Sequence, residues 1–311
     1  MGRVLITGGA GFIGSSLARA LLASGARVRI LDNFATGRRE NLADILDDVE
    51  VVEETICSAE ACRRAAKGCE TIFHQAADVS VPRSMIDPEN THRTNVDGLY
   101  NCLVAAREQG VRRLVFASSS AVYGPEATLP AVESLPFRPI SPYGASKGIG
   151  ELYCAMFSRC FGVETVCLRY FNVFGPRQDP ASQYAAAIPA FVSRMLRGER
   201  PVVFGTGEQS RDFTFVDNVV QANLKAAGAT VDGPVVANIG CGRGISLNEI
   251  IGVVNGLLGT SLEPVYEAAR AGDILHSWAD VSAARRLIGY EPSVDFQDGL
   301  RRAIEWYRQN L

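Results

Sequence analysis

The stretch Thr7–Gly14, with the sequence TGGAGFIG, decides the fold class of this 311-residue chain. It follows an apolar run predicted as a strand over Arg3–Thr7, and it opens a helix predicted over Phe12–Ser24. Its glycines have the spacing G-x-x-G-x-x-G, which allows a tight turn and a close approach of backbone to a pyrophosphate at the helix N-terminus. A plain turn is the alternative, but the position between a first strand and a first helix favours dinucleotide binding.

Outward from this turn, short β-branched runs alternate with amphipathic helical stretches. Continuous apolar strands of this kind are typical of parallel sheets buried on both faces. The alternation predicts an α/β fold, a doubly wound parallel sheet of the Rossmann type. The further strands are predicted over Arg27–Leu31, Val49–Glu53, Thr71–His74, Arg113–Ala117 and Thr165–Arg169, and the helices over Ala59–Gly68, Thr91–Gln109 and Pro142–Cys160.

After about residue 175 the alternation loosens and prolines interrupt the chain. We expect a dinucleotide-binding domain over 1–175 and a smaller, mainly helical domain over 176–311, with part of 201–245 returning to the sheet. The second domain is expected to cap the carboxyl ends of the strands, where open α/β sheets bind ligands. Its helices are predicted near 186–197, 217–228, 246–258, 281–287 and 296–309.

Composition excludes several classes of protein. A net charge of −3 argues against a nucleic-acid partner, and 47% hydrophobic residues argue against disorder. The longest uncharged stretch, Val4–Ala18, is too short to cross a bilayer and lacks the features of a signal peptide. The eight cysteines and three histidines show no metal-ligand spacing. We expect a soluble, cytoplasmic protein with reduced thiols, no metal and no membrane contact.

Asp32 ends the second predicted strand, eighteen residues after Gly14. A carboxylate there accepts hydrogen bonds from both ribose hydroxyls of an adenosine and repels a 2′-phosphate. At 4 Å and an effective dielectric constant near 20, like charges cost about 4 kcal/mol. The sequence therefore predicts NAD rather than NADP, although Arg38 and Arg39 follow nearby and are otherwise read as part of a solvated loop.

Tyr143 and Lys147 form a Tyr-x-x-x-Lys pattern inside a helix start, with Ser141 as N-cap and Pro142 at the first helical position. The spacing places phenol and ammonium on one helix face. A tyrosine base at pH 7 needs its pKa lowered from about 10 to about 7, which costs about 4 kcal/mol. A neighbouring lysine and a positively charged nicotinamide supply such a shift. The alternative is a surface pair.

Three serines, Ser118–Ser120, follow the strand predicted over Arg113–Ala117. A serine at this carboxyl edge is placed to bond a substrate hydroxyl and share its proton with Tyr143. At least one of the three is expected only to form the turn.

Together these features resemble the extended short-chain dehydrogenase/reductase superfamily, and within it the nucleotide-sugar epimerases and dehydratases. The nearest resemblance is to UDP-hexose 4-epimerases, particularly the subgroup that also takes N-acetylated sugars. The motifs run over nearly the whole chain: Thr7–Gly14, Leu31–Asn33, His74–Ala77, Asn95–Gly98, Val122–Gly124, Tyr143/Lys147, Leu168–Asn172, Ser210–Phe213 and Gly272-Asp273, with Arg177–Pro180 and Tyr184–Pro189 for the subgroup.

The resemblance implies that Tyr143 removes the proton of the sugar 4-hydroxyl while Lys147 lowers the pKa of Tyr143 and holds the nicotinamide ribose. Ser119, four residues before Tyr123, assists, with Ser120 as the second choice. Hydride passes from sugar carbon 4 to NAD⁺ and returns to the other face of a 4-keto sugar. The catalytic set is thus Ser119, Tyr143 and Lys147.

The resemblance also implies a cofactor site. The family often carries an aspartate that contacts the adenine amine, where this chain has Thr55 before Ile56, so that contact is expected to be weaker. The expected NAD-binding residues are Gly8, Gly11, Phe12, Ile13, Gly14, Asp32, Asn33, Gly37, Thr55, Ile56, Gln75, Ala76, Ala77, Asn95, Ser118, Tyr143, Lys147 and Tyr170.

For a UDP-sugar substrate, Arg211 and Arg270 are expected to clamp the diphosphate, because guanidinium groups match phosphate geometry. Surface ion pairs are the alternative for both. Ser277 stands where the family alternates between tyrosine and a small residue, so it is expected to leave room for an acetamido group; a turn cap is the alternative. The expected substrate-binding residues are Ser80, Ser119, Ser120, Tyr143, Asn172, Gln178, Ala186, Phe204, Arg211, Arg270, Asp273 and Ser277.

The sequence disfavours three other functions. A sugar 4,6-dehydratase needs an acid pair after the catalytic hydroxyl residue and a decarboxylase needs a glutamate, but Ser120 and Ala121 stand there. A non-catalytic dinucleotide sensor is disfavoured by the presence of Tyr143 and Lys147.

The helices Thr91–Gln109 and Pro142–Cys160 resemble those that pair two subunits in this family, so a homodimer is expected.

Overall fold

The computed structural model describes residues 2–179, 187–269 and 274–310. Seven parallel strands form its main sheet, in the order β11-β6-β5-β4-β1-β2-β3. The order reverses between β1 and β4, and such a switch point opens a crevice at the carboxyl ends of the strands. The strands are β1 (Arg3–Thr7), β2 (Arg27–Asp32), β3 (Val49–Glu53), β4 (Thr71–His74), β5 (Arg113–Ser119), β6 (Glu164–Tyr170) and β11 (Val235–Ile239).

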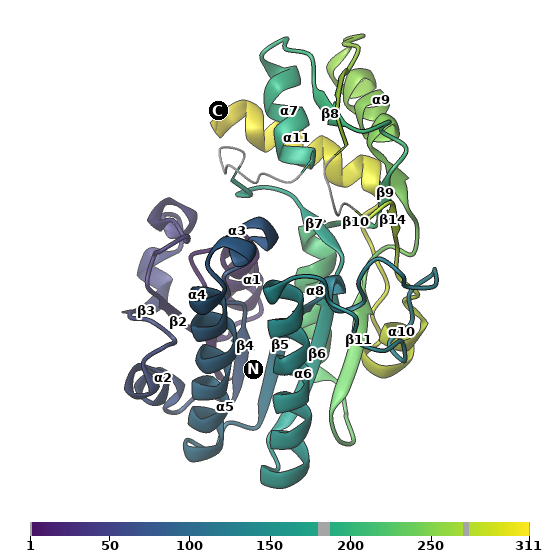
Figure 1. The fold of residues 1–311 in the computed structure, drawn as a ribbon. Helices are drawn as coiled ribbons and strands as arrows, with labels where there is room; N and C mark the ends of the chain where they lie inside the picture. The colour runs from purple at the N-terminus through teal and green to yellow at the C-terminus, as the bar shows by residue number, and fades with distance from the viewer. Residues whose placement is uncertain (1, 180–186, 270–273, 311) are drawn as a thin grey trace.

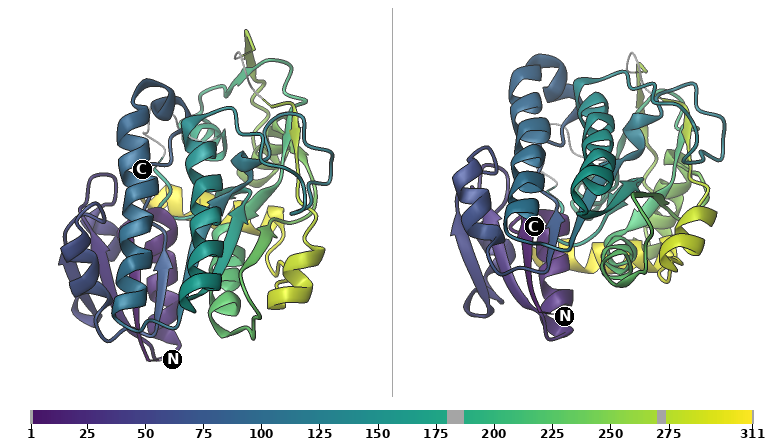
Figure 2. Two further views of the ribbon diagram at one scale, coloured as in Figure 1. Left: turned by 60° about the horizontal axis from the view of Figure 1, so that its bottom comes forward. Right: turned by 90° about the horizontal axis from the view of Figure 1, so that it is seen from below.

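Helices cover both faces of this sheet (Figure 2). One face carries α2 (Ala59–Ala66), α5 (Gly98–Glu108) and α6 (Pro142–Phe161), and the other carries α1 (Phe12–Ala23) and α8 (Val216–Gly228). Burial on both faces of the sheet explains why its strands are continuously apolar. In β1, for example, Val4, Leu5 and Ile6 are at most 1% exposed. The prediction of a doubly wound parallel sheet is confirmed.

One predicted helix differs from the structure. The sequence predicted a single helix over Thr91–Gln109, whereas helical structure begins earlier with α4 (Pro88–His92), passes through a π-turn over Arg93–Asp97 and continues as α5. Pro88 stands at the first helical position behind the cap Asp87, which explains the earlier start. The extra residue in the π-turn lies where Asn95 turns inward to bond the backbone of Asp78.

Much of the second half of the chain, including α7, α9 and α11, lies beyond the carboxyl ends of the sheet (Figure 1). β10 pairs with β7, β13 pairs with β8, and β9 lies between β12 and β14. The helices are α7 (Ala187–Leu196), α9 (Leu247–Leu258), α10 (Ser282–Ile288) and α11 (Phe296–Asn310); the short strands are β7 (Asn172–Phe174), β8 (Val202–Phe204), β9 (Ser210–Arg211), β10 (Phe213–Phe215), β12 (Ile245–Ser246), β13 (Val265–Glu267) and β14 (His276–Ser277).

The chain returns to the main sheet within its second half. β11 pairs with β6, and α8 packs against α1 on the face opposite α6. One hydrophobic cluster joins the two halves, since it holds Ile6 and Val115 of the sheet together with Phe213 and Leu300. Among the described helices, none is both long and apolar enough to cross a membrane.

Candidate active site

The glycine turn closes against the exit of β4. Gly8 has a φ of 70°, and a Cβ there would lie 2.7 Å from the backbone of Ala76; a Cβ on Gly14 would lie 2.1 Å from the carbonyl oxygen of Gly8. Glycine is therefore required at both positions. Helix α1 begins behind Gly11 with no side-chain cap, so its first amides are available to a bound anion.

Asp32 fixes this turn from the end of β2. The amide of Ala10 donates to its Oδ2 and the amide of Phe34 to its Oδ1, both at 2.8 Å. A carboxylate has further lone pairs, so these bonds leave capacity for ribose hydroxyls. Gly37 packs so closely that a Cβ on it would lie 3.0 Å from Oδ2. The residues at the switch point thus fit a bound dinucleotide.

Thr55, the departure from the family pattern, uses its hydroxyl locally. Its Oγ1 accepts a hydrogen bond of 3.2 Å from the amide of Cys57, and the adjacent Ile56 is buried. A bond from Thr55 to the adenine has to compete with this turn.

Gln75 and Tyr170, both predicted at the cofactor, meet Asn223 of α8 in a polar group. The Nδ2 of Asn223 donates to the Tyr170 hydroxyl at 2.8 Å, and the Nε2 of Gln75 donates to Oδ1 of Asn223 at 3.1 Å. Burial raises the pKa of Tyr170 to about 12. Asn223 was missed by the sequence analysis because nothing in its local pattern separates it from other polar helix residues.

Two other predicted cofactor residues bond within the protein. The Nδ2 of Asn95 donates to the carbonyl of Asp78 and to Ser146 Oγ, both at 3.0 Å. The Ser118 hydroxyl donates to Glu151 at 2.5 Å. Glu151 stands four residues after Lys147, a signal that the sequence analysis did not use.

Glu151 in turn forms a buried ion pair with Arg169 of β6. The Nη2 of Arg169 lies 2.7 Å from Oε2 of Glu151, and both side chains are 3% exposed. The pair ties α6 to the sheet directly below the residues predicted to be catalytic.

Tyr143, Lys147 and Ser119 come together where α6 crosses the end of β5. Lys147 donates from Nζ to the carbonyl of Ala117 at 2.8 Å, and its ammonium lies 5.7 Å from the centre of the Tyr143 ring. Ser119, the last residue of β5, hydrogen-bonds to Tyr143. The structure thus assembles the predicted catalytic set.

The electrostatics of this group differ from the expectation in one respect. Burial raises the pKa of Tyr143, and within the chain the hydrogen bond of Ser119 opposes this rise. Burial also lowers the pKa of Lys147 to about 7, because a charged ammonium is costly where only 3% of the residue is exposed. The chain alone therefore does not produce the lowered pKa of Tyr143 that the resemblance implies.

A cavity of about 220 Å³ opens beside Tyr143. It lies between the end of β5 and the pair of strands β9 and β14, which run parallel with His276 opposite Ser210 and Ser277 opposite Arg211. Six of the residues predicted to bind substrate line it: Ser119, Ser120, Tyr143, Asn172, Arg211 and Ser277.

Three further predicted substrate residues do not line this cavity. Ser80 caps α3 (Val81–Ile86), Gln178 donates its amide to the carbonyl of Val173, and Phe204 lies in β8. Sequence position within a motif does not determine which way these side chains point. The remaining three, Ala186, Arg270 and Asp273, lie outside the described residues.

The structure adds residues that the sequence analysis left out. His276 lines the cavity, with Nδ1 2.9 Å from the hydroxyl of Ser210, and Tyr123 lines it while donating to Asn238 at 2.6 Å. Asp212, which is fully buried, accepts backbone amides of Cys241, Gly242 and Ala279 and so joins β9 to the chain that follows β14. Its place in the motif Ser210–Phe213 was the available signal.

Comparison with known proteins identifies the family. Residues 4–240 match the NAD dependent epimerase/dehydratase family. UDP-glucose 4-epimerase of Mycolicibacterium smegmatis is 38% identical over 310 residues, which cover 98% of both chains.

Two solved structures are similar over 99% of this chain. UDP-N-acetylglucosamine 4-epimerase of Methanobrevibacter ruminantium, in complex with UDP-N-acetylmuramic acid, has a TM-score of 0.95, 38% identity and 99% of its own chain covered. UDP-glucose 4-epimerase of Thermus thermophilus, in complex with NAD, has a TM-score of 0.89, 35% identity and 100% of its own chain covered. The chain therefore belongs to the NAD-dependent epimerase/dehydratase family, and its cofactor is NAD.

Proposed function

We propose that this protein is a UDP-hexose 4-epimerase that acts through a transient 4-keto sugar. The observation that carries the proposal is the position of Tyr143 and Ser119 in the wall of a cavity that Asn172 and Arg211 also line. A base, a hydrogen-bonding hydroxyl and a cation for a diphosphate thus face one space of sugar size.

In this proposal Tyr143 takes the proton of the sugar 4-hydroxyl while Ser119 holds the same oxygen. Bound NAD supplies a hydride acceptor for carbon 4 and the donor for its return. Lys147 holds the nicotinamide ribose, and Arg211 anchors the diphosphate so that the sugar ring can turn over between the two steps. The same tyrosine returns the proton, and the reaction is redox-neutral because the hydride taken from carbon 4 also returns to the sugar.

The cavity favours epimerisation over dehydration or decarboxylation. Within residues 2–179, 187–269 and 274–310, none of the side chains that line it is a carboxylate. A dehydratase needs an acid to expel water from the sugar, and the two positions after Ser119 are Ser120 and Ala121.

Ser277 supports acceptance of N-acetylated sugars. It lines the cavity next to Arg211 on the neighbouring strand, and its small side chain would leave space for a substituent on the sugar 2-position. The relative from Methanobrevibacter ruminantium is named a UDP-N-acetylglucosamine 4-epimerase, which agrees with this substrate. We assign NAD to the domain 1–175 and the UDP-sugar to 176–311.

A direct experiment tests the activity. The purified protein is incubated with UDP-glucose and, separately, with UDP-N-acetylglucosamine, without added reductant, and the products are identified by NMR. We expect the 4-epimer from both. No epimer from either substrate contradicts the proposed function, and product from UDP-glucose alone contradicts the inference from Ser277.

The protein is further proposed to be a homodimer through α5 and α6. Their outer faces carry exposed apolar side chains, including Tyr100 at 43% and Leu152 at 62%. Exposed apolar residues grouped on neighbouring helices are typical of an interaction surface.

A further inference from the structure

Tyr143 stands at the second position of α6, where a helix has unpaired amide groups. Ser141 caps this end by accepting the amide of Gly144 at 3.1 Å. The amide of Tyr143 itself is satisfied from another element: it donates to Ser84 Oγ of α3 at 3.2 Å. Ser84 is fully buried, and its hydroxyl donates to the carbonyl of Val81 at 2.7 Å. The backbone of Tyr143 is therefore held by α3.

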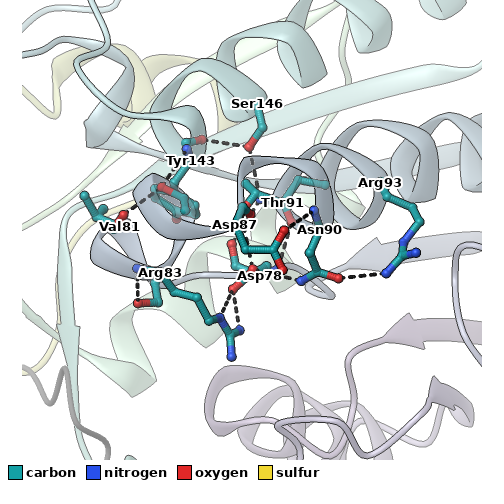
Figure 3. Close-up of polar contacts among 12 residues, drawn as sticks. Asp78, Val81, Arg83, Asp87, Asn90, Thr91, Arg93, Tyr143 and Ser146 are labelled. Atoms are coloured by element: carbon teal, nitrogen blue, oxygen red, sulfur yellow. Dashed lines mark hydrogen bonds and ion pairs between the residues drawn. The ribbon is translucent and has the colours of Figure 1, made fainter.

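Helix α3 is only six residues long, so its position depends on what anchors it. The anchor is the carboxylate of Asp78, which is 2% exposed. Its Oδ1 accepts two hydrogen bonds from the guanidinium of Arg83, one of them from Nε at 3.0 Å. Its Oδ2 accepts from Asn90 at 3.1 Å and from Thr91 at 3.3 Å. One buried carboxylate thus joins α3 to α4, as the dashed lines in Figure 3 show.

A second connection runs from the backbone of Asp78 to α6. Oδ1 of Asn95, in the π-turn, accepts the amide of Asp78 at 2.7 Å, and its Nδ2 donates to the carbonyl of Asp78 and to Ser146. Ser146 in turn donates to the carbonyl of Tyr143 at 2.7 Å. Asp78 is therefore linked to the amide of Tyr143 through Arg83 and Ser84 of α3, and to its carbonyl through Asn95 and Ser146.

We propose that Asp78 is a positioning residue that sets the place of the Tyr143 side chain by fixing α3 and the π-turn against the start of α6. A buried carboxylate with four hydrogen bonds is a costly feature unless its geometry serves the structure around it. Arg83 of α3 and Asn90 and Thr91 of α4 donate its four hydrogen bonds, and none of these donors belongs to the proposed catalytic set. The proposal rests on the function proposed above, because its consequence is the alignment of a base.

The test compares Asp78→Asn with Asp87→Asn in the holoenzyme. Asp87 is exposed and caps α4 nine residues away, and asparagine caps as well as aspartate, so this control makes the same charge change with the cap retained. With UDP-glucose, Asp78→Asn is expected to lower kcat by about tenfold or more and to change KM by less than about threefold, because misplaced reacting groups slow chemistry. Asp87→Asn is expected to keep both. Equal behaviour of the two variants overturns the proposal.

A double-mutant cycle identifies the route. If Asp78 acts through Ser84, then Asp78→Asn combined with Ser84→Ala should lower kcat no further than the larger single effect. Multiplied losses would show independent roles and overturn the proposed route. Thermal unfolding of each variant separates misalignment of Tyr143 from loss of folded protein. If the variant only unfolds more easily, its activity should decrease in proportion to the folded fraction.

The proposed function and this inference fail separately. Absence of turnover in the wild-type protein contradicts the proposed function. The positioning role of Asp78 can then be tested by amide hydrogen exchange, which does not require enzymatic activity. Faster exchange over 81–86 and 141–147 in Asp78→Asn, but not in Asp87→Asn, is expected. Unchanged exchange in these two segments would overturn it.

Discussion

In the proposed mechanism Tyr143 has to lose a proton near neutral pH, although its surroundings favour the protonated phenol. Burial raises its pKa, and Lys147 below it is itself so buried that its pKa falls to about 7. The positive charge of an oxidised nicotinamide is the contribution that would lower the pKa of the tyrosine. On this basis we expect Tyr143 to act as a base only in the holoenzyme, where a bound oxidised nicotinamide would supply the positive charge.

Tyr143→Phe removes the proposed base and leaves the ring. We expect kcat to fall by at least about a hundredfold, which is the usual contribution of acid–base catalysis, while NAD stays bound. Turnover is measured by NMR and bound NAD by its release on denaturation. Activity close to the wild type would reject Tyr143 as the base.

Ser277→Tyr tests the proposed pocket beside the sugar 2-position. The bulky ring should exclude an acetamido group, so kcat/KM for UDP-N-acetylglucosamine is expected to fall by about tenfold or more while UDP-glucose is still converted. Ser277→Ala is the matched control and keeps the space. Equal losses for both substrates would contradict the assignment.

Lys147 gives a pH dependence of stability. It binds its proton more weakly in the folded chain, with a pKa of about 7, than in the unfolded chain, where a lysine has about 10.4. Between these values the unfolded chain holds more protons, so the free energy of unfolding rises with pH by up to about 1.4 kcal/mol per pH unit from this group. Urea unfolding from pH 7 to pH 10 should therefore show a shallower dependence for Lys147→Met. Parallel curves would contradict the burial argument.

At the scale of single elements, one face of α6 carries two of the three residues proposed to be catalytic. Tyr143, Lys147 and Glu151 follow at four-residue spacing, and the ion pair of Glu151 with Arg169 fixes the helix to β6. The sequence predicted this helix, its cap and the first two residues of the face. It did not predict the third, because only the fold brings Arg169 beside it.

Glu151→Gln tests this attachment. Breaking one side of a buried ion pair leaves the other charge without its partner, so a loss of about 3 to 5 kcal/mol in the free energy of unfolding is expected. The double variant Glu151→Met/Arg169→Met removes both charges and should recover most of that loss. Denaturant unfolding measures both, and an unchanged midpoint for Glu151→Gln would contradict the expectation.

The helix predicted over Thr91–Gln109 shows what local sequence patterns cannot predict. Its apolar spacing predicted the correct type of element, but the π-turn over Arg93–Asp97 depends on bonds from Asn95 to Asp78 and Ser146, which lie 17 and 51 residues away. No helical period contains that information.

At the scale of the whole molecule, the apolar faces of α5 and α6 point away from the sheet core. Replacing Leu152, which is 62% exposed, with glutamate should weaken the proposed dimer without disturbing the fold. Light scattering after size-exclusion chromatography is expected to show a dimer for the wild type and a shift toward monomer for Leu152→Glu. A monomeric wild type would contradict the proposed dimer.

The sequence by itself determined the glycine turn and the parallel sheet and singled out Tyr143 as the candidate base, because each of these depends on neighbours a few residues away. Gly8, Gly11 and Gly14 are read from their spacing, and Tyr143 with Lys147 from a helical turn. Only the tertiary structure decided which side chains line the cavity, that Asn95 and Ser118 bond within the protein, and that Ser84 accepts the amide of Tyr143. These depend on contacts between segments far apart in the chain, which packing alone brings together.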